Sequence, residues 1–334
     1  MRSLKSFYGS WFYIWNHVRL LLRHITVRRA ANVLLNQWEF FLRKEKLRSN
    51  PVFLKIDPSN RCQLRCPGCG QASADFRASL PKKGFLTLAE FKQLIDPIAH
   101  TTLGLSLSNL GEPLLNKEIA SLIKYAHSKG IGVTISTNLS IQPQREFLKQ
   151  IVASGLDKLL VSLDGASSAT YKQYRIGGEY EWVTANVKML ADLKRELNSS
   201  TPEIFWKFIV FDHNRHEVSR VPAQYKEMGF DAYRIDTDRY AGEVVSFKKS
   251  RYAKKKNCFW PYSTMVIDAD GTLNPCCSFA GTKWELGDVL ATTDVRELWN
   301  SDIYQELRRG FSRKNYGAAM HPVCRTCFGG NARS

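Results

Sequence analysis

The stretch from residue 51 to residue 238 alternates short runs of β-branched and aromatic residues with segments of helical periodicity. This alternation is typical of parallel βα units, because a parallel strand needs a crossover helix to reach the next strand. Six strands are expected, at Val52 to Asp57, Leu103 to Ser108, Gly132 to Thr137, Lys158 to Asp164, Ile204 to Phe211 and Asp231 to Asp236. Right-handed crossovers would then place functional residues on the loops at the carboxyl ends of these strands.

Helical patterns fill the gaps between the strands. They begin near Thr87, Asn116, Gln142, Ala169, Trp182 and Asn214. Thr87 with Glu90 forms a capping box, and Asn116 and Asn214 suit helix N-caps. Six repeated units of this kind predict an α/β fold, a partial (β/α)6 TIM-like barrel.

The chain is long enough to form further segments besides the barrel. The chain has 334 residues, 44% of them hydrophobic and 24% charged, which excludes a disordered tail and a disulfide miniprotein. We expect an N-terminal helical extension over residues 1–50, the barrel over 51–238, a basic linker over 239–257 and a small C-terminal α+β domain over 258–334. With no 18-residue apolar run and no secretory signal, the expected compartment is the cytoplasm.

The first 50 residues are basic and aromatic. They hold ten Lys and Arg, two Glu and nine aromatic residues. Two apolar stripes recur at helical spacing, one from Trp11 to Ile25 and one from Ala31 to Leu42, and they predict two amphipathic helices. Such helices can dock on the catalytic domain or lie peripherally at the inner face of a membrane, and both interpretations remain open.

Charge points to an anionic partner without choosing one. The formal net charge is +17, and the linker adds a basic run from Lys248 to Lys256. Phosphorylated substrates, lipid headgroups and nucleic acid all fit this balance. The basic run is also typical of a solvated loop.

The C-terminal domain has a simple expected layout. A hairpin over Met265 to Ile267 turns at Asp270 and Gly271, and a helix follows near Asp294 to Arg309.

Eight cysteines fall into two groups, and none lies between the groups. The first group is Cys62, Cys66 and Cys69, and the second is Cys258, Cys276, Cys277, Cys324 and Cys327. In a chain expected to be cytoplasmic, this grouping favours metal or cluster ligation over disulfides. For the second group, both a zinc site and an iron–sulfur cluster satisfy the residue pattern.

The first group follows the first expected strand. A structural zinc site normally needs four protein ligands, and no fourth Cys or His lies within twenty residues of this loop. Three thiolates can instead hold three irons of a [4Fe-4S] cubane and leave the fourth iron open.

The spacing Cys62-x3-Cys66-x2-Cys69 after a strand resembles the signature of the radical S-adenosylmethionine (SAM) superfamily. The resemblance implies that the open iron is chelated by SAM. It also implies that Gly111, Glu112 and Pro113 receive the ammonium group of SAM. One departure is Gly68, which stands where family members often have an aromatic residue that touches the adenine.

Polar residues at later strand ends extend the resemblance. It implies that SAM hydroxyl and carboxylate groups are held by Ser136, Asn138, Ser162 and Asp164. Helix capping or turn formation is the alternative role for these residues. The resemblance further implies that Arg175 meets a carboxylate with its guanidinium group, and simple surface exposure is the alternative.

Residues 258–327 resemble the start and end of a SPASM or twitch auxiliary domain. The resemblance implies one auxiliary [4Fe-4S] cluster held by Cys258, Cys276, Cys324 and Cys327. Adjacent cysteines are awkward joint ligands, and the Gly-x4-Cys spacing selects Cys276 over Cys277. The spare Cys277 is then either a buried inert thiol or a speculative hydrogen-atom donor.

The resemblance implies a radical SAM oxidoreductase. A reduced cluster would cleave SAM to methionine and a 5'-deoxyadenosyl radical that abstracts a substrate hydrogen atom, and the auxiliary cluster would accept the remaining electron. The implied partners are an electron donor such as flavodoxin or ferredoxin and a small-molecule substrate, which we expect to be a sugar or a lipid-linked precursor. The alternatives are a peptide maturase and, from another class, a non-catalytic basic metal-binding module that binds nucleic acid. That last alternative leaves Gly111-Glu112-Pro113 unexplained.

Overall fold

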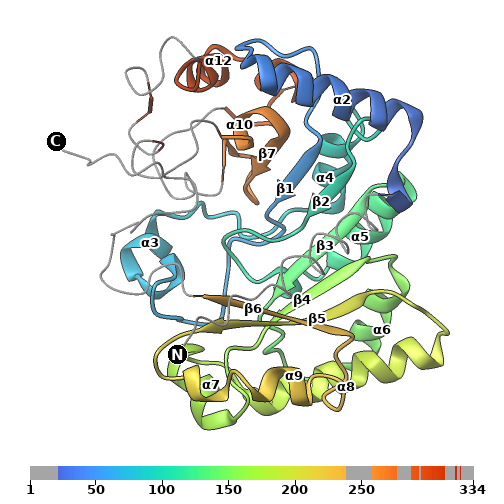
Figure 1. The fold of residues 1–334 in the computed structure, drawn as a ribbon, viewed down its shortest axis with the longest axis vertical. Coiled ribbons are helices and arrows are strands. Elements are labelled where there is room, and N and C mark those ends of the chain that lie inside the picture. The colour runs from blue at the N-terminus through green and yellow to red at the C-terminus, as the bar shows by residue number, and fades with distance from the viewer. Residues whose placement is uncertain are drawn as a thin grey trace, which may run out of the picture.

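The computed structural model describes residues 22–237, 258–276, 287–292, 295–312, 320, 321 and 324. One sheet of eight strands forms the centre of the described part, in the order β6-β5-β4-β3-β2-β1-β7-β8 (Figure 1). The strands are β1 (Phe53–Ile56), β2 (Gly104–Ser106), β3 (Gly132–Thr137), β4 (Lys158–Ser162), β5 (Glu203–Val210), β6 (Ala232–Thr237), β7 (Thr264–Ile267) and β8 (Leu273–Asn274).

All six strands expected between residues 51 and 238 are present, and consecutive strands pair in parallel. The fold is therefore the predicted α/β partial barrel. The predicted C-terminal hairpin is also present, because β7 and β8 pair antiparallel around Gly271. The sequence did not predict that β7 pairs in parallel with β1, which makes the hairpin an extension of the barrel sheet.

Helices follow the strands as the periodicity predicts. They are α2 (Val27–Leu42), α3 (Ala74–Ser79), α4 (Leu88–Ile95), α5 (Ile119–Ser128), α6 (Arg145–Ala153), α7 (Ser168–Tyr174), α8 (Tyr180–Glu196), α9 (Arg220–Gln224), α10 (Trp260–Ser263), α11 (Val295–Trp299) and α12 (Asp302–Arg309), with 3-10 turns η1 (Gly70–Ala72), η2 (Pro113–Leu115) and η3 (Arg215–Glu217). The capping box at α4 is confirmed, because Thr87 and Glu90 bond reciprocally.

Three expectations about the helices were wrong. Asn116 does not cap α5, because the N-cap of that helix is Glu118, whose backbone N–H donates to Asn116 Oδ1. The side chain of Asn214 does not cap a helix, because its Oδ1 accepts from the backbone N–H of Phe211 and its Nδ2 donates to the Asp164 carbonyl. The single helix expected near Asp294 to Arg309 is two helices, α11 and α12, with residues 300 and 301 between them.

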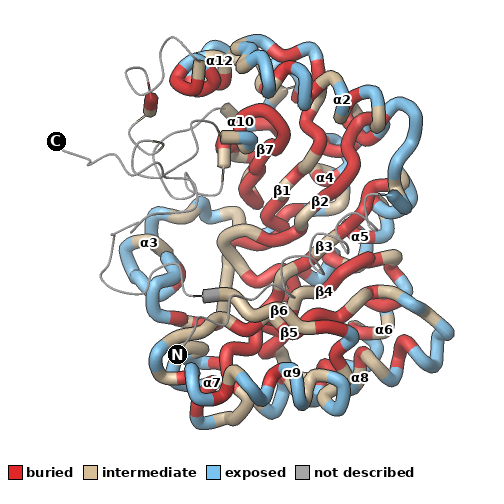
Figure 2. The backbone as a smooth tube through the Cα atoms, viewed as in Figure 1, coloured by how far each residue is buried: buried red, intermediate tan, exposed pale blue. Residues whose placement is uncertain are grey.

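The two faces of the sheet differ in polarity. Side chains on one face are apolar and buried, as with Ile56, Ile135 and Trp206. Figure 2 shows that most of the length of β1 to β4 is buried. Neighbouring positions on the strands project to the opposite face, which carries Lys55, Ser106, Ser136, Ser162 and Lys207 in the paired register. We call this opposite face the polar face of the sheet.

Helix α2 docks on the barrel, but in the reverse of the usual orientation. Its buried residues are Arg29, Asn32, Asn36 and Glu39, whereas its apolar stripe is exposed. An apolar stripe normally faces the core, so the sequence pattern did not predict this orientation. Among the described residues, no helix combines the length and the apolarity that crossing a bilayer requires. The residues of the first predicted helix before Leu22 and the linker 239–257 lie outside the described residues.

Candidate active site

The first three cysteines lie on one loop at the carboxyl end of β1. Cys62 is half-buried, Cys66 is buried and Cys69 is exposed. The backbone N–H of Cys69 donates to the carbonyl of Cys66 at 3.1 Å, and Cys69 then leads into η1. We call residues 60–72 the cluster loop.

Backbone and side-chain bonds hold the cluster loop against its surroundings. Asn60 donates through Nδ2 to the Lys83 carbonyl at 2.9 Å, and Gln71 donates through Nε2 to the Asn60 carbonyl at 2.9 Å. Arg65 donates through Nη1 to the carbonyls of Cys62 and Leu64, both at 2.8 Å. The loop is therefore shaped by the protein chain itself.

At two positions in or beside the cluster loop, the conformation of the backbone or its close packing explains why the residue is glycine. A Cβ on Gly111 would lie 1.9 Å from the Ser59 carbonyl oxygen, so no larger residue fits where the loop meets the turn after β2. Gly68 has φ +78°, in the left-handed region that favours glycine. This conformation gives a physical reason for the departure at Gly68 from the aromatic residue that the resemblance implies.

N–H groups from the end of β3 and from the C-terminus of α7 approach the thiols. Asn138 directs Nδ2 at the Sγ of Cys62 from 3.8 Å, and Arg175 directs Nη1 at the Sγ of Cys66 from 3.7 Å. Asn138 is held in place by Gln63, which donates through Nε2 to its Oδ1 at 3.0 Å. Gln63 was not among the expected site residues, although it directly follows the first cysteine.

Arg175 and Asp164 form a buried ion pair at the end of β4. The Nε of Arg175 donates to Oδ2 of Asp164 at 2.8 Å, and Nη2 lies 2.5 Å from the same oxygen. The other carboxylate oxygen of Asp164 accepts from the backbone N–H of Ile209 at 2.7 Å. Arg175 therefore meets a protein carboxylate and is not simply exposed at the surface. Desolvation opposes its charge, but the neighbouring Asp164 and Cys66 raise its pKa above the ordinary value.

Glu112 joins the turn after β2 to the end of β3. Its Oε1 accepts from Thr137 Oγ1 at 2.5 Å and from the Leu114 backbone N–H at 3.1 Å, and its Oε2 accepts from the Asn138 backbone N–H at 2.7 Å. Burial raises the pKa of Glu112, and these bonds oppose the rise. The carboxylate thus positions Asn138 beside the thiols, and its predicted contact with SAM stays a prediction.

Two further carboxyl groups end β1 and β7. Burial raises the pKa of Asp57 to about 7 and that of Asp268 to about 6. One oxygen of Asp57 accepts from the Leu110 N–H, and the other has no partner among the described residues. Asp268 accepts from Asn109 at 3.1 Å and from Asn274 at 2.8 Å. Sequence reasoning missed both, although each directly follows a strand.

The polar face carries positive charge close to Arg175. Ser162, Lys207 and Arg234 are neighbours across β4, β5 and β6. Burial lowers the pKa of Lys207, and Arg175 lowers it further. Of the other expected residues, Ser136 lies on β3 with Leu160 as its neighbour on β4.

Three of the expected auxiliary ligands are described. Cys258 precedes α10, Cys276 follows β8 and Cys324 lies near the C-terminus, and each is half-buried. Cys327 and Cys277 lie outside the described residues. Within the described part of the chain, no three His, Cys, Asp or Glu side chains converge closely enough to hold one metal ion.

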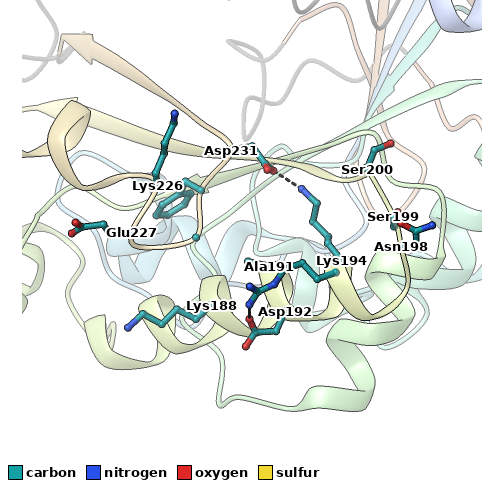
Figure 3. Close-up of a pocket in the computed structure, with 13 residues that line it drawn as sticks. Lys188, Ala191, Asp192, Lys194, Asn198, Ser199, Ser200, Lys226, Glu227 and Asp231 are labelled. Carbon is teal, nitrogen blue, oxygen red and sulfur yellow. Dashed lines mark hydrogen bonds and ion pairs between the residues drawn. The ribbon is translucent and has the colours of Figure 1, made fainter.

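A surface hollow beside α8 lies apart from the cysteines (Figure 3). Lys194 and Asp231 line it and form an ion pair at 2.5 Å, and Arg195 pairs with Asp192. Four of its seven charged side chains thus pair with one another.

Comparison with known families assigns the chain to a class. A model of the radical SAM superfamily matches residues 56–202, and a model of the SPASM iron-sulfur cluster-binding domain matches residues 258–328. The chain belongs to the radical SAM superfamily. More particularly, it is a radical SAM enzyme with a SPASM domain, as the two cysteine groups predicted.

The chain resembles several characterised proteins. It is 29% identical over 177 residues to the AdoMet-dependent heme synthase of Methanosarcina barkeri, covering 52% of this chain and 47% of that protein. It is 31% identical over 233 residues to the GTP 3',8-cyclase of Rhizobium meliloti, covering 67% of this chain and 60% of that protein. The chain thus spans about half the length of these curated relatives.

A solved structure shows the same fold. SuiB of Streptococcus suis bound to S-adenosylmethionine superimposes with a TM-score of 0.62 at 15% identity, over 91% of this chain and 79% of that chain. At this identity the likeness concerns the fold alone.

The family implies SAM, a SAM-binding [4Fe-4S] cluster and auxiliary iron–sulfur chemistry as cofactors. The residues fit the first cluster, because three thiols share one loop and two N–H groups point at their sulfurs, as is typical around iron–sulfur clusters. Burial raises the pKa of Cys62 to about 12, so this thiol needs the positive charge of bound iron to become a thiolate at neutral pH.

Proposed function

We propose that the protein is a radical SAM oxidoreductase that removes a hydrogen atom from a small anionic substrate and passes the remaining electron to one auxiliary [4Fe-4S] cluster. The observation that carries the proposal is the convergence on the cluster loop of Asn138 from β3 and Arg175 after β4. The family membership favours this enzyme over a nucleic-acid-binding metal module.

The chain's own residues would bind SAM and the substrate and orient them toward each other. When bound and reduced, the cluster on Cys62, Cys66 and Cys69 supplies the electron that cleaves SAM. Arg175 offers a positive charge beside that cluster, and Asp164 fixes its direction. The backbone of Gly111 to Pro113 and the side chains of Ser136 and Ser162 are proposed to bind SAM.

The substrate class follows from charge. Lys207 and Arg234 lie side by side on the polar face, where Arg234 pairs with Asp236 at 2.8 Å, and the positive charge of Lys207 and Arg175 suits a substrate that carries phosphate or carboxylate. The relatives include a GTP 3',8-cyclase, whose named substrate is a triphosphate. A phosphate-bearing sugar or lipid-linked precursor meets this requirement, with flavodoxin or ferredoxin as the proposed electron donor.

A peptide maturase is the second candidate. SuiB bound to its precursor peptide SuiA superimposes on 83% of this chain with a TM-score of 0.62. A peptide with acidic residues would also suit the cationic polar face.

Iron analysis of two adjacent cysteine variants tests the auxiliary cluster. Two cubanes predict about eight irons per chain after anaerobic reconstitution of the full-length protein. Cys276→Ala should fall to about four, and Cys277→Ala, the matched control, should keep about eight. Cys277→Ala should also leave SAM cleavage intact. A product that takes up a hydrogen atom with the unmodified protein but not with Cys277→Ala would instead assign Cys277 as a hydrogen-atom donor and contradict electron transfer to the cluster.

Three results would contradict parts of the proposal. About four irons in the unmodified protein would remove the auxiliary cluster. Stoichiometric zinc would identify a zinc site in its place. A loss of iron in Cys277→Ala but not in Cys276→Ala would move the ligand to Cys277.

A further inference from the structure

Helix α2 presents an apolar stripe to solvent. Val27 is 87% exposed, Leu34 71%, Trp38 57% and Phe41 62%. These positions are seven, four and three residues apart, so they share one side of the helix. Figure 2 shows exposed stretches along α2. The rings of Trp38 and Phe41 stack with centroids 6.1 Å apart, which makes the stripe continuous at its C-terminal end.

The polar side of α2 is the side that holds the fold together. Arg29 donates to the carbonyls of Ala99, Lys129 and Gly130. These carbonyls follow α4 and α5, where unpaired carbonyl groups collect at helix C-termini. The guanidinium group of Arg29 therefore bonds to carbonyl groups near these helix ends, whereas Val27, Leu34 and Trp38 stay exposed.

The C-terminal half of α2 is held in the same way. Asn36 donates to the Tyr262 carbonyl at 2.5 Å and accepts from Ser263 Oγ at 2.8 Å. Glu39 accepts from the backbone N–H groups of Arg48 at 2.8 Å and Ser49 at 3.1 Å. These bonds fix the orientation of the helix without help from Leu34 or Trp38.

Positive charge flanks the stripe. The exposed basic residues at and near the helix are Arg23, Arg28, Lys44, Lys46 and Arg48. Of the two acidic residues in this region, Glu39 is buried and Glu45 pairs with Arg309 at 3.0 Å. A hollow beside the stripe is lined on its sides by Arg28, Arg48 and His100.

We propose that α2 binds the surface of an anionic lipid bilayer. The stripe enters the boundary between headgroups and acyl chains, and Arg28 and Arg48 receive a lipid phosphate in the hollow between them. Tryptophan and phenylalanine on one face with arginine and lysine beside them are typical of helices that lie in this interface.

Charge selects a bilayer over the two other possible occupants. A second copy of the chain would bring the same basic surface against itself. Residues 1–21 contain three Lys and Arg and no Asp or Glu, so they too would add like charge. An anionic bilayer brings the opposite charge and an apolar interior together.

The position of α2 determines which side of the barrel a bound bilayer would cover. The helix bonds to residues that precede β1, β3 and β7, at the amino ends of the strands. The cluster loop follows the carboxyl end of β1 (Figure 1). A bilayer on α2 would therefore leave the cysteine side of the barrel open to substrate.

Vesicle sedimentation of the full-length protein tests the proposal. We expect binding to phosphatidylcholine vesicles that contain phosphatidylglycerol, weak binding to pure phosphatidylcholine and loss of binding at high salt. Trp38→Ser should weaken binding about tenfold, because the indole no longer leaves water. Arg28→Gln should weaken it about fivefold on anionic vesicles only. Trp182→Ser, at a Trp that is 40% exposed on α8, is the matched control and should bind like the unmodified protein.

Three outcomes would overturn the proposal. The first is equal vesicle binding by Trp38→Ser and the unmodified protein. The second is a dimer in analytical ultracentrifugation that Trp38→Ser abolishes, which would assign the stripe to a second copy. The third is unchanged vesicle binding by Trp38→Ser together with a lower free energy of unfolding than that of the unmodified protein. This result would assign the stripe to contact with residues 1–21. The inference is independent of the proposed catalysis, because sedimentation uses no SAM and a failed cleavage assay would leave it standing.

Discussion

At the scale of single residues, Asp57 is the clearest case of a side chain whose charge the fold opposes. It is fully buried at the end of β1, and burial raises its pKa from 3.8 to about 7. The Leu110 backbone N–H opposes the rise, and the charge of nearby Asp268 adds to it. The folded state thus binds a proton that the unfolded chain releases near pH 4.

This shift fixes the sign of a pH dependence. Because the folded state holds more protons between about pH 4 and pH 7, the free energy of unfolding should fall as pH rises through that window and level off above it. The contribution of Asp57 is about 2 kcal/mol between about pH 5.5 and pH 7. Asp57→Asn should lose this part of the slope in anaerobic denaturant unfolding curves. An unchanged slope in the variant would contradict the shifted pKa.

The residues of the site were partly predictable from the sequence. Asn138, Asp164 and Arg175 were expected from strand ends and a resemblance, and the structure brings all three near Cys62 and Cys66. The Arg175 to Asp164 pair and the Gln63 to Asn138 bond were not predictable, because each joins residues whose separation in space depends on tertiary packing.

At the scale of elements, the strands were predictable because parallel strands buried on one face are short β-branched and aromatic runs. The orientation of α2 was not predictable. Periodicity shows that a helix has an apolar side, but here Arg29, Asn36 and Glu39 bond to backbone groups of the barrel, and those bonds decide which side faces inward.

The shape of the cluster loop depends on Gly111, which lies outside the loop in the turn after β2. Gly111→Ala would place a Cβ 1.9 Å from the Ser59 carbonyl oxygen, so the loop must shift. We expect a loss of SAM cleavage of about 100-fold, the effect of a displacement of about 1 Å at a reacting centre. We also expect a lower iron content, because the SAM-binding cluster would be held less well. Deoxyadenosine formation and iron content measure the two effects.

Gly68→Ala is the matched control for this loop. A Cβ there would meet nothing within 4 Å among the described residues, and the left-handed conformation costs about 1 kcal/mol for alanine. Gly68→Ala should therefore keep its iron and most of its activity. Equal losses in the two variants would show that contact with Ser59 is not the cause.

At the scale of the whole molecule, the two cysteine groups belong to one continuous sheet. Cys62 follows β1, Cys276 follows β8, and the β7 to β8 hairpin joins β1 directly. The strand pairing fixes the barrel and this part of the SPASM domain to each other without a flexible joint between β1 and β7. A fixed arrangement of this kind suits transfer of an electron from substrate to an auxiliary cluster.

The most direct test of the central claim is the formation of 5'-deoxyadenosine by the anaerobically reconstituted full-length protein with SAM and dithionite. We expect deoxyadenosine from the unmodified protein and none from Cys66→Ala, because the buried Cys66 thiol on the cluster loop is proposed as one of three ligands of the SAM-binding cluster. Deoxyadenosine formed by Cys66→Ala at the rate of the unmodified protein would contradict it.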